Sequence, residues 1–255
     1  MDSLSYFKDI EAVVLRNPDV LHEHVASGIF ETLEFFDFAR TASEETDVES
    51  FKIHGSVGFT FWAGHEPDPT SLPNRFADWI TSVSLRRLIE IYSEYLNKAI
   101  LAAEHRDGHP ASDEAELERR SLNERIGLLH QKLGSEGRKS MNSYKKKLSS
   151  VNWARNILEH RRGIVSERDA RSGTFRLQFE QRVITPAAFD AEEGNLAASV
   201  SHRNVVLKFN AGDTILLSST DLTNICQTFA NHAMRVTRGL KNEPFGGSVE
   251  TTYTF

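Results

Sequence analysis

The sequence predicts a mainly α-helical bundle with a small antiparallel β insertion before its last helix. Two segments, residues 74–106 and 219–240, repeat apolar residues with the 3.6-residue period of an α-helix. Between them, residues 175–179 and 205–209 alternate apolar and polar side chains, which is typical of strands with one buried face. We therefore expect the helices to share one core and the two alternating stretches to pair beside it.

The N-terminal region is predicted to add helices that pack on this bundle. Residues 3–16 and 19–42 have helical spacing, and Asn17-Pro18-Asp19 separates them, with Asp19 as the helix cap. Residues 43–74 are interpreted as a long connection that contains a short strand or hairpin. Its aromatic residues either pack onto the helices or offer rings on which bases can stack. The apolar stripe of the second helix is expected in the core and is rich in phenylalanine: Val20, Leu21, Val25, Phe30, Leu33, Phe36 and Phe38.

The central region is predicted to contain three consecutive helices. The first, at 74–106, is capped by Asn74 and ends at Asp107-Gly108, and the second covers 112–134. The third runs from about Ser140 to His160. We assign residues 1–73 to N-terminal helices and the connection, 74–240 to a helical domain with a β insertion at about 174–217, and 241–255 to a flexible tail.

Composition excludes several classes of protein. A chain of 255 residues with 39% hydrophobic and 26% charged residues can bury a core and is ordered in water. A single cysteine, Cys226, excludes a disulfide framework and a cysteine-based zinc site. The start of the chain lacks the features of a secretion signal, and no apolar run approaches the roughly 18 residues of a membrane span. We therefore expect a cytoplasmic protein that does not contact membranes.

Basic residues are concentrated in one segment, although the chain as a whole has a net charge of −6. Residues 137–176 contain eleven Lys and Arg but three Asp and Glu, a local charge of +8 that leaves −14 on the remainder. Such an uneven distribution of charge suits a face that binds phosphate groups. The alternative is a solvated helix followed by a charged loop, which has the same composition. Charge alone does not decide between the two.

One stretch of this basic segment groups side chains that are suited to catalysis. Residues 151–165, VNWARNILEHRRGIV, are predicted to form the end of a helix and a glycine turn. Asn156 and His160 are four residues apart and lie on nearly one helix face, whereas Arg155 is offset from His160 by about 140°. Helix geometry alone therefore brings the amide and the imidazole together, and the turn at Gly163 decides where the guanidinium lies.

This stretch resembles the active-site motif of ribonuclease-type members of the HEPN superfamily. The resemblance is carried by Arg155-Asn156, by His160 after three further residues, and by Gly163-Ile164-Val165. The order of helices around the motif is compatible with the HEPN bundle. Glu159 departs from the pattern, because many members have an apolar residue there. The Tyr that follows the His in toxins paired with a nucleotidyltransferase antitoxin is also absent.

The resemblance implies an endoribonuclease that needs no metal and no cofactor. Arg155 would stabilise the negatively charged phosphorane, His160 would act as general base or acid, and Asn156 would hold His160 or the phosphate. It further implies a homodimer with both active sites in one cleft, and a role in bacterial defence or as a toxin, with an antitoxin or regulatory partner. Five basic side chains are predicted to bind the RNA backbone: Lys145, Lys146, Lys147, Arg161 and Arg162.

Two alternative explanations account for the same residues. An Arg near a His at a helix end often occurs by chance, and a protonated His is itself mildly stabilising at a helix C-terminus. Within the superfamily, some members bind RNA or act as helical scaffolds without catalysis.

Overall fold

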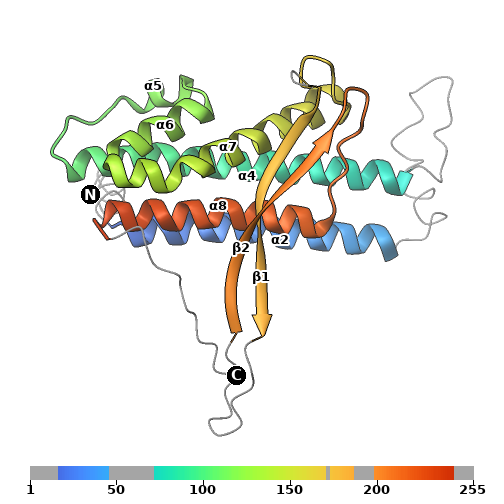
Figure 1. Cartoon of the computed structure of the whole chain (residues 1–255), viewed down its shortest axis with the longest axis horizontal. Helices are drawn as coiled ribbons and strands as arrows, with labels where there is room; N and C mark the ends of the chain where they lie inside the picture. The colour runs from blue at the N-terminus through green and yellow to red at the C-terminus, as the bar shows by residue number, and fades with distance from the viewer. Residues whose placement is uncertain (1–16, 46–71, 171–172, 187–197, 244–255) are drawn as a thin grey trace, which may run out of the picture.

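The computed structural model describes residues 17–45, 72–170, 173–186 and 198–243 (Figure 1). The predicted helix at 3–16, the hairpin in the connection and the tail from 244 lie outside these residues. The described elements are α2 (Pro18–Glu45), α4 (Leu72–Arg106), α5 (Glu114–Arg119), α6 (Leu122–Lys132), α7 (Gly134–Arg161), β1 (Phe175–Pro186), β2 (Ala198–Phe209) and α8 (Ser219–Leu240). The prediction of a mainly helical protein with a two-stranded antiparallel sheet before the last helix is therefore confirmed.

The four long helices α2, α4, α7 and α8 lie side by side along the length of the molecule (Figure 1). Helix α2 packs against α4 and α8, and α7 packs against α4, α6 and α8. Their apolar faces form one continuous core, with Tyr92 and Leu96 from α4, Val151 from α7 and Phe229 from α8 fully buried. Among the described helices, none combines the length and apolar character that a membrane span requires.

The paired strands run from beside the end of α7 across the middle of α8 and project beyond the helices (Figure 1). They pair antiparallel from Phe175 opposite Phe209 to Pro186 opposite Ala198. Strand β1 packs on α7 and α8, and its alternate side chains Phe175, Leu177 and Phe179 are buried there, as the sequence pattern predicts. The strands extend beyond the predicted stretches, to twelve residues each.

The predicted helix at 112–134 is wrong in one respect, because it is divided into α5 and α6. Arg120 has an extended backbone, and Ser121 begins a new helix with a capping box. The Ser121 hydroxyl accepts a hydrogen bond from the backbone N–H of Glu124, whose carboxylate accepts one from the backbone N–H of Ser121 at 2.7 Å. After α6, Leu133 alone separates it from α7, which begins at Gly134 rather than near residue 140.

The phenylalanine stripe of α2 is also not all in the core. Phe30 and Phe38 are 60% and 75% exposed, whereas Phe36 is buried. The buried positions of α2 follow a spacing of three and four residues, and Phe30 and Phe38 fall between them. The packing of α2 on α4 and α8 therefore selects a different face from the one that its aromatic residues suggest.

Candidate active site at the end of α7

The motif segment stays helical through His160. Helix α7 ends at Arg161, and Arg162 and Gly163 adopt left-handed backbone angles, with φ of 53° and 79°. The Gly163 N–H donates to the Ile157 carbonyl at 3.1 Å, which is a Schellman-type helix end. A Cβ at Gly163 would lie 3.4 Å from Leu158 as well as demand an unfavourable φ, so glycine suits this turn.

The Gly-Ile-Val segment that follows is fixed by the chain just before α8. Ile164 forms a β-bridge with Thr214, and the Val165 N–H donates to the Asp213 carbonyl at 2.9 Å. The Ile215 N–H in turn donates to the Gly163 carbonyl at 2.9 Å. These backbone hydrogen bonds hold the turn after the motif in place from a part of the sequence some fifty residues away.

Arg155 lies along the surface of α7 toward Glu159. Its Nη1 donates to Glu159 Oε2 at 2.8 Å and its Nη2 donates to Asn152 Oδ1 at 3.2 Å. The side chain is 24% exposed, and its buried Nε has no hydrogen-bond partner among the described residues. The guanidinium therefore retains unused N–H groups beside its ion pair.

Glu159 links Arg155 to His160 and to a second arginine. The Nε2 of His160 lies 3.9 Å from Glu159 Oε2, and the Nε of Arg86, on α4, lies 3.6 Å from Glu159 Oε1. The imidazole of His160 is 72% exposed, so its ring is open to solvent. Asn156 is also exposed and lies one helical turn before His160 on the same side. The structure thus gathers Arg155, Glu159 and His160 with Arg86.

Sequence reasoning assigned neither Glu159 nor Arg86 to the site. The four-residue spacing of Arg155 and Glu159 is a signal that could have identified their ion pair in advance. Arg86 is more than seventy residues away in the sequence, and only the packing of α4 beside α7 brings it to Glu159.

Lys147 is not on the face predicted to bind RNA. Its ammonium donates to Glu180 Oε1 of β1 at 2.6 Å, and its side chain is 9% exposed. It also lies over the ring of Tyr144, with 4.9 Å from Nζ to the ring centroid. Lys147 is buried because its position on α7 faces β1 rather than solvent. Lys147 is therefore a core residue that neutralises a buried carboxylate.

The other four basic residues differ in their solvent exposure and in their ion pairing. Lys146 and Arg162 are exposed, and Lys145 is half-buried with its ammonium near Gly127 of α6. Arg161 is hydrogen-bonded and ion-paired to Asp169. Lys146 and Arg162 therefore have the most accessible charges of this set.

Asp169 anchors the loop that follows the motif. Its buried carboxylate accepts hydrogen bonds from the Ser166 N–H at 2.9 Å, from Trp153 Nε1 at 2.8 Å and from Arg161. Burial by itself raises the pKa of Asp169, but the hydrogen bonds from Ser166, Arg161 and Trp153 outweigh it and hold the pKa well below its usual value. The carboxylate therefore stays ionised and restrains Arg161 beside the end of α7.

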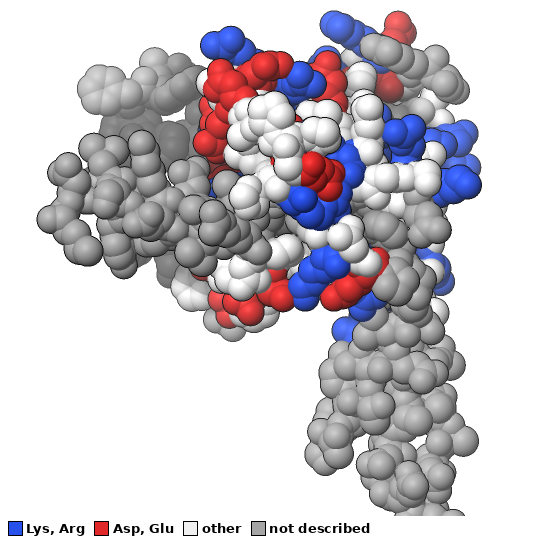
Figure 2. Space-filling view, turned by 90° about the vertical axis from the view of Figure 1, so that its left-hand side faces the viewer, with Lys and Arg blue, Asp and Glu red and all other residues white. Residues whose placement is uncertain are grey.

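Figure 2 views the molecule from the end where α5 and α6 lie, and the described surface there mixes acidic and basic side chains.

Within the described residues, no group of three or more His, Cys, Asp and Glu side chains is arranged to hold a metal ion. Comparison of the chain with protein-family profiles, curated proteins and solved structures returned no match.

Proposed function

We propose that this protein is a HEPN-type endoribonuclease that cleaves RNA without a metal ion and uses Arg155 and His160 as its reacting pair. The observation that carries the proposal is the exposed imidazole of His160, which shares the Glu159 carboxylate with the guanidinium of Arg155 at a helix end. The motif residues resemble those of the ribonuclease-type members of that superfamily. The proposal therefore rests on this geometry and on the motif together.

The chemistry is a displacement within the RNA. A base removes the proton of the 2′-hydroxyl, the 2′-oxygen bonds to the adjacent phosphorus, and the bond from phosphorus to the 5′-oxygen breaks. An acid then supplies a proton to the departing 5′-oxygen, which leaves a cyclic phosphate and a 5′-hydroxyl. Histidine suits either proton transfer near neutral pH, and the unused N–H groups of Arg155 suit the charge that develops on the phosphate.

A two-fold homodimer would supply a second His160 across the cleft, so that one imidazole acts as base and the other as acid. Mixing wild type with increasing amounts of His160→Ala protein tests this directly. If both imidazoles are needed, mixed dimers are inactive and cleavage falls as the square of the wild-type fraction, whereas a linear fall would contradict a site that uses both histidines. A protein that is monomeric by sedimentation and cleaves RNA would contradict the dimer and leave the reaction intact.

The accessible basic side chains Lys146 and Arg162 are proposed to bind the RNA backbone, with smaller contributions from Lys145 and Arg161. Each phosphate contact that is lost should flatten the dependence of RNA affinity on salt concentration. A double Lys146→Ala and Arg162→Ala variant is therefore expected to have a shallower slope than the wild type. An unchanged slope would remove these two residues from the interface.

The alternative function is a non-catalytic RNA-binding or scaffolding bundle. It is favoured by one observation, the ion pair of 2.8 Å that already occupies Arg155 with Glu159. RNA incubated with the protein and a chelator separates the two functions. Cleavage that is lost in Arg155→Ala and in His160→Ala, but retained in the exposed control His105→Ala, supports the enzyme. Binding without cleavage, unchanged in all three variants, supports the scaffold.

A further inference from the structure

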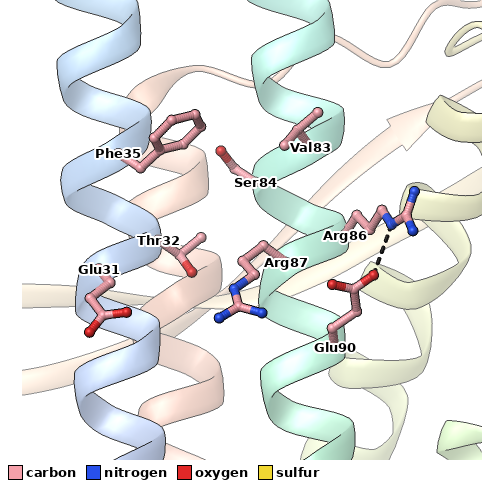
Figure 3. A pocket seen from close by; sticks show the side chains of 8 residues that line it. All are labelled: Glu31, Thr32, Phe35, Val83, Ser84, Arg86, Arg87 and Glu90. Atoms are coloured by element: carbon pink, nitrogen blue, oxygen red, sulfur yellow. Dashed lines mark hydrogen bonds and ion pairs between the residues drawn. The ribbon is translucent and has the colours of Figure 1, made fainter.

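A groove between α2 and α4 opens beside the candidate active site. It has a volume of about 530 Å³, and side chains of both helices line it (Figure 3). Arg86 forms one edge of the groove, where its Nε lies 2.8 Å from Glu90 Oε1 and 3.6 Å from Glu159 Oε1. The groove therefore adjoins the carboxylate that Arg155 and His160 share.

The groove presents an aromatic ring to whatever enters it. Phe35 of α2 is 49% exposed and lies on the side of the groove opposite Ser84 and Val83 of α4 (Figure 3). A half-exposed ring on the wall of a groove is a surface on which a nucleic-acid base can stack. Phe30, on the same helix, is also exposed but does not line the groove, so the two residues can be compared.

Ser84 supplies an unsatisfied hydrogen-bonding group at the groove. The residue is 1% exposed, and its Oγ has no hydrogen-bond partner among the described residues. Figure 3 shows the hydroxyl directed from α4 toward α2, into the space between the helices. Because a buried hydroxyl without a partner is destabilising, such a group indicates a site at which a ligand atom completes the hydrogen bonding.

The charged side chains of the groove suit a nucleotide better than a simple anion. Arg86 is paired with Glu90, whereas Arg87 is exposed and forms no ion pair among the described residues. Arg87 can therefore bind a phosphate. Glu31, on the α2 side, can only accept hydrogen bonds, so it repels a phosphate but accepts from the N–H groups of a base.

We propose that this groove binds one unpaired nucleotide of RNA. Its base stacks on Phe35, its phosphate binds Arg87, its polar atoms reach Ser84, and the carboxylate of Glu31 accepts from the base edge. Guanine fits best, because its Watson–Crick edge has two adjacent N–H donors. The placement of this nucleotide next to the cleaved bond rests on the proposed nuclease function, but its binding does not.

Calorimetric titration of the full-length protein with 5′-GMP, 5′-AMP and inorganic phosphate tests the proposal. GMP is expected to bind more tightly than AMP or phosphate. Phe35→Ala and Arg87→Ala should each weaken GMP binding about tenfold, consistent with the loss of one stacked base or one charged contact. The matched controls Phe30→Ala and Arg119→Ala should leave it unchanged. Glu31→Gln should reduce the preference for GMP over AMP.

The outcomes separate this proposal from the nuclease. If the wild type binds no GMP, binds phosphate as tightly as GMP, or binds GMP equally in the groove variants, the nucleotide site is wrong whether or not RNA is cleaved. If GMP binding is weakened in Phe35→Ala and Arg87→Ala while the wild type cleaves no RNA, the groove is supported and the nuclease fails. If both hold, the groove variants should raise the KM for RNA more than they lower kcat.

Discussion

Two clusters of polar side chains, one in the core and one at the end of α7, use the same residue types in opposite surroundings. In the core, the Nε2 atoms of His130 and His232 are 2.7 Å apart, and the Tyr92 hydroxyl is hydrogen-bonded to Nδ1 of His232. His232 is completely buried. At the end of α7, His160 is largely exposed, and its closest charged partner is Glu159 at 3.9 Å.

The acidic residues of the two clusters differ in their partners. Glu180 in the core accepts hydrogen bonds from Lys147 at 2.6 Å, Tyr144 at 2.9 Å and Asn231 at 3.1 Å. Glu159 is only slightly more exposed, at 18% against 11% for the Glu180 side chain, and its partners are Arg155 and Arg86. The two histidines therefore teach that burial, rather than residue type, separates a group that holds this fold together from one that is open to a ligand.

The largest expected effect comes from replacing one histidine of each cluster. His160→Ala should lower RNA cleavage about a hundred- to ten-thousandfold and leave the melting temperature unchanged, because an exposed ring is removed. His232→Ala should destabilise the fold by about 3 kcal/mol, because it creates a cavity and leaves His130 and Tyr92 without a partner. Cleavage rates and thermal melting curves measure both. Equal losses of stability would contradict the distinction.

The ion pairs give the next largest contrast. Lys147→Met should cost about 3–5 kcal/mol in the free energy of unfolding, because it leaves Glu180 buried without its charge partner. The matched control is Arg120→Met, which removes an exposed ion pair with Glu116 on α5 and should cost less than about 1 kcal/mol. Urea denaturation of both variants tests this. A Lys147 variant that is fully stable but binds RNA less tightly would restore the role predicted from the sequence.

The buried histidines should also make stability depend on pH. Burial, with a smaller effect of Lys145, lowers the pKa of His130 to about 4, and burial also lowers the pKa of His232 well below its usual value. The unfolded chain binds these protons from about pH 6.5 downward while the folded chain does not. The stability that the two neutral histidines contribute is therefore fully present above about pH 6.5 and is lost as the pH falls toward 4.

The slope should reach about 1.4 kcal/mol per pH unit for each buried histidine. Unfolding free energies at pH 7.5, 6 and 5 measure it, above the range in which the lowered carboxylate pKa values matter. His130→Leu should have a shallower slope than the wild type over this window. An identical slope in the two proteins would place the proton uptake elsewhere.

The smallest expected effect sharpens the comparison at Glu159. Glu159→Gln keeps the size of the side chain but removes the charge that neutralises Arg155. RNA should bind about two- to fivefold more tightly, in line with the modest free energy of a partly exposed ion pair. Fluorescence polarisation with labelled RNA measures the change. Weaker binding or slower cleavage would instead identify Glu159 as a residue that positions Arg155 and His160.

The sequence by itself determined the type and approximate position of the long helices and the two strands. The apolar period at 74–106 corresponds to α4, and the alternation of Phe175, Leu177 and Phe179 corresponds to the buried face of β1. These signals are local, because helix and strand periodicity are set by neighbouring residues along the chain. The capping box of Ser121 and Glu124 was equally local and could have predicted the division of α5 from α6.

Only the tertiary structure decided which side chains are exposed and which long-range partners they have. Lys146 and Lys147 are adjacent in sequence, yet one faces solvent and the other contacts Glu180, because β1 covers a single face of α7. Arg86 reaches Glu159, and Phe35 and Ser84 face one groove, because α4 packs beside both α7 and α2. Periodicity fixes the faces of a helix, but the elements that pack against it determine which face is buried.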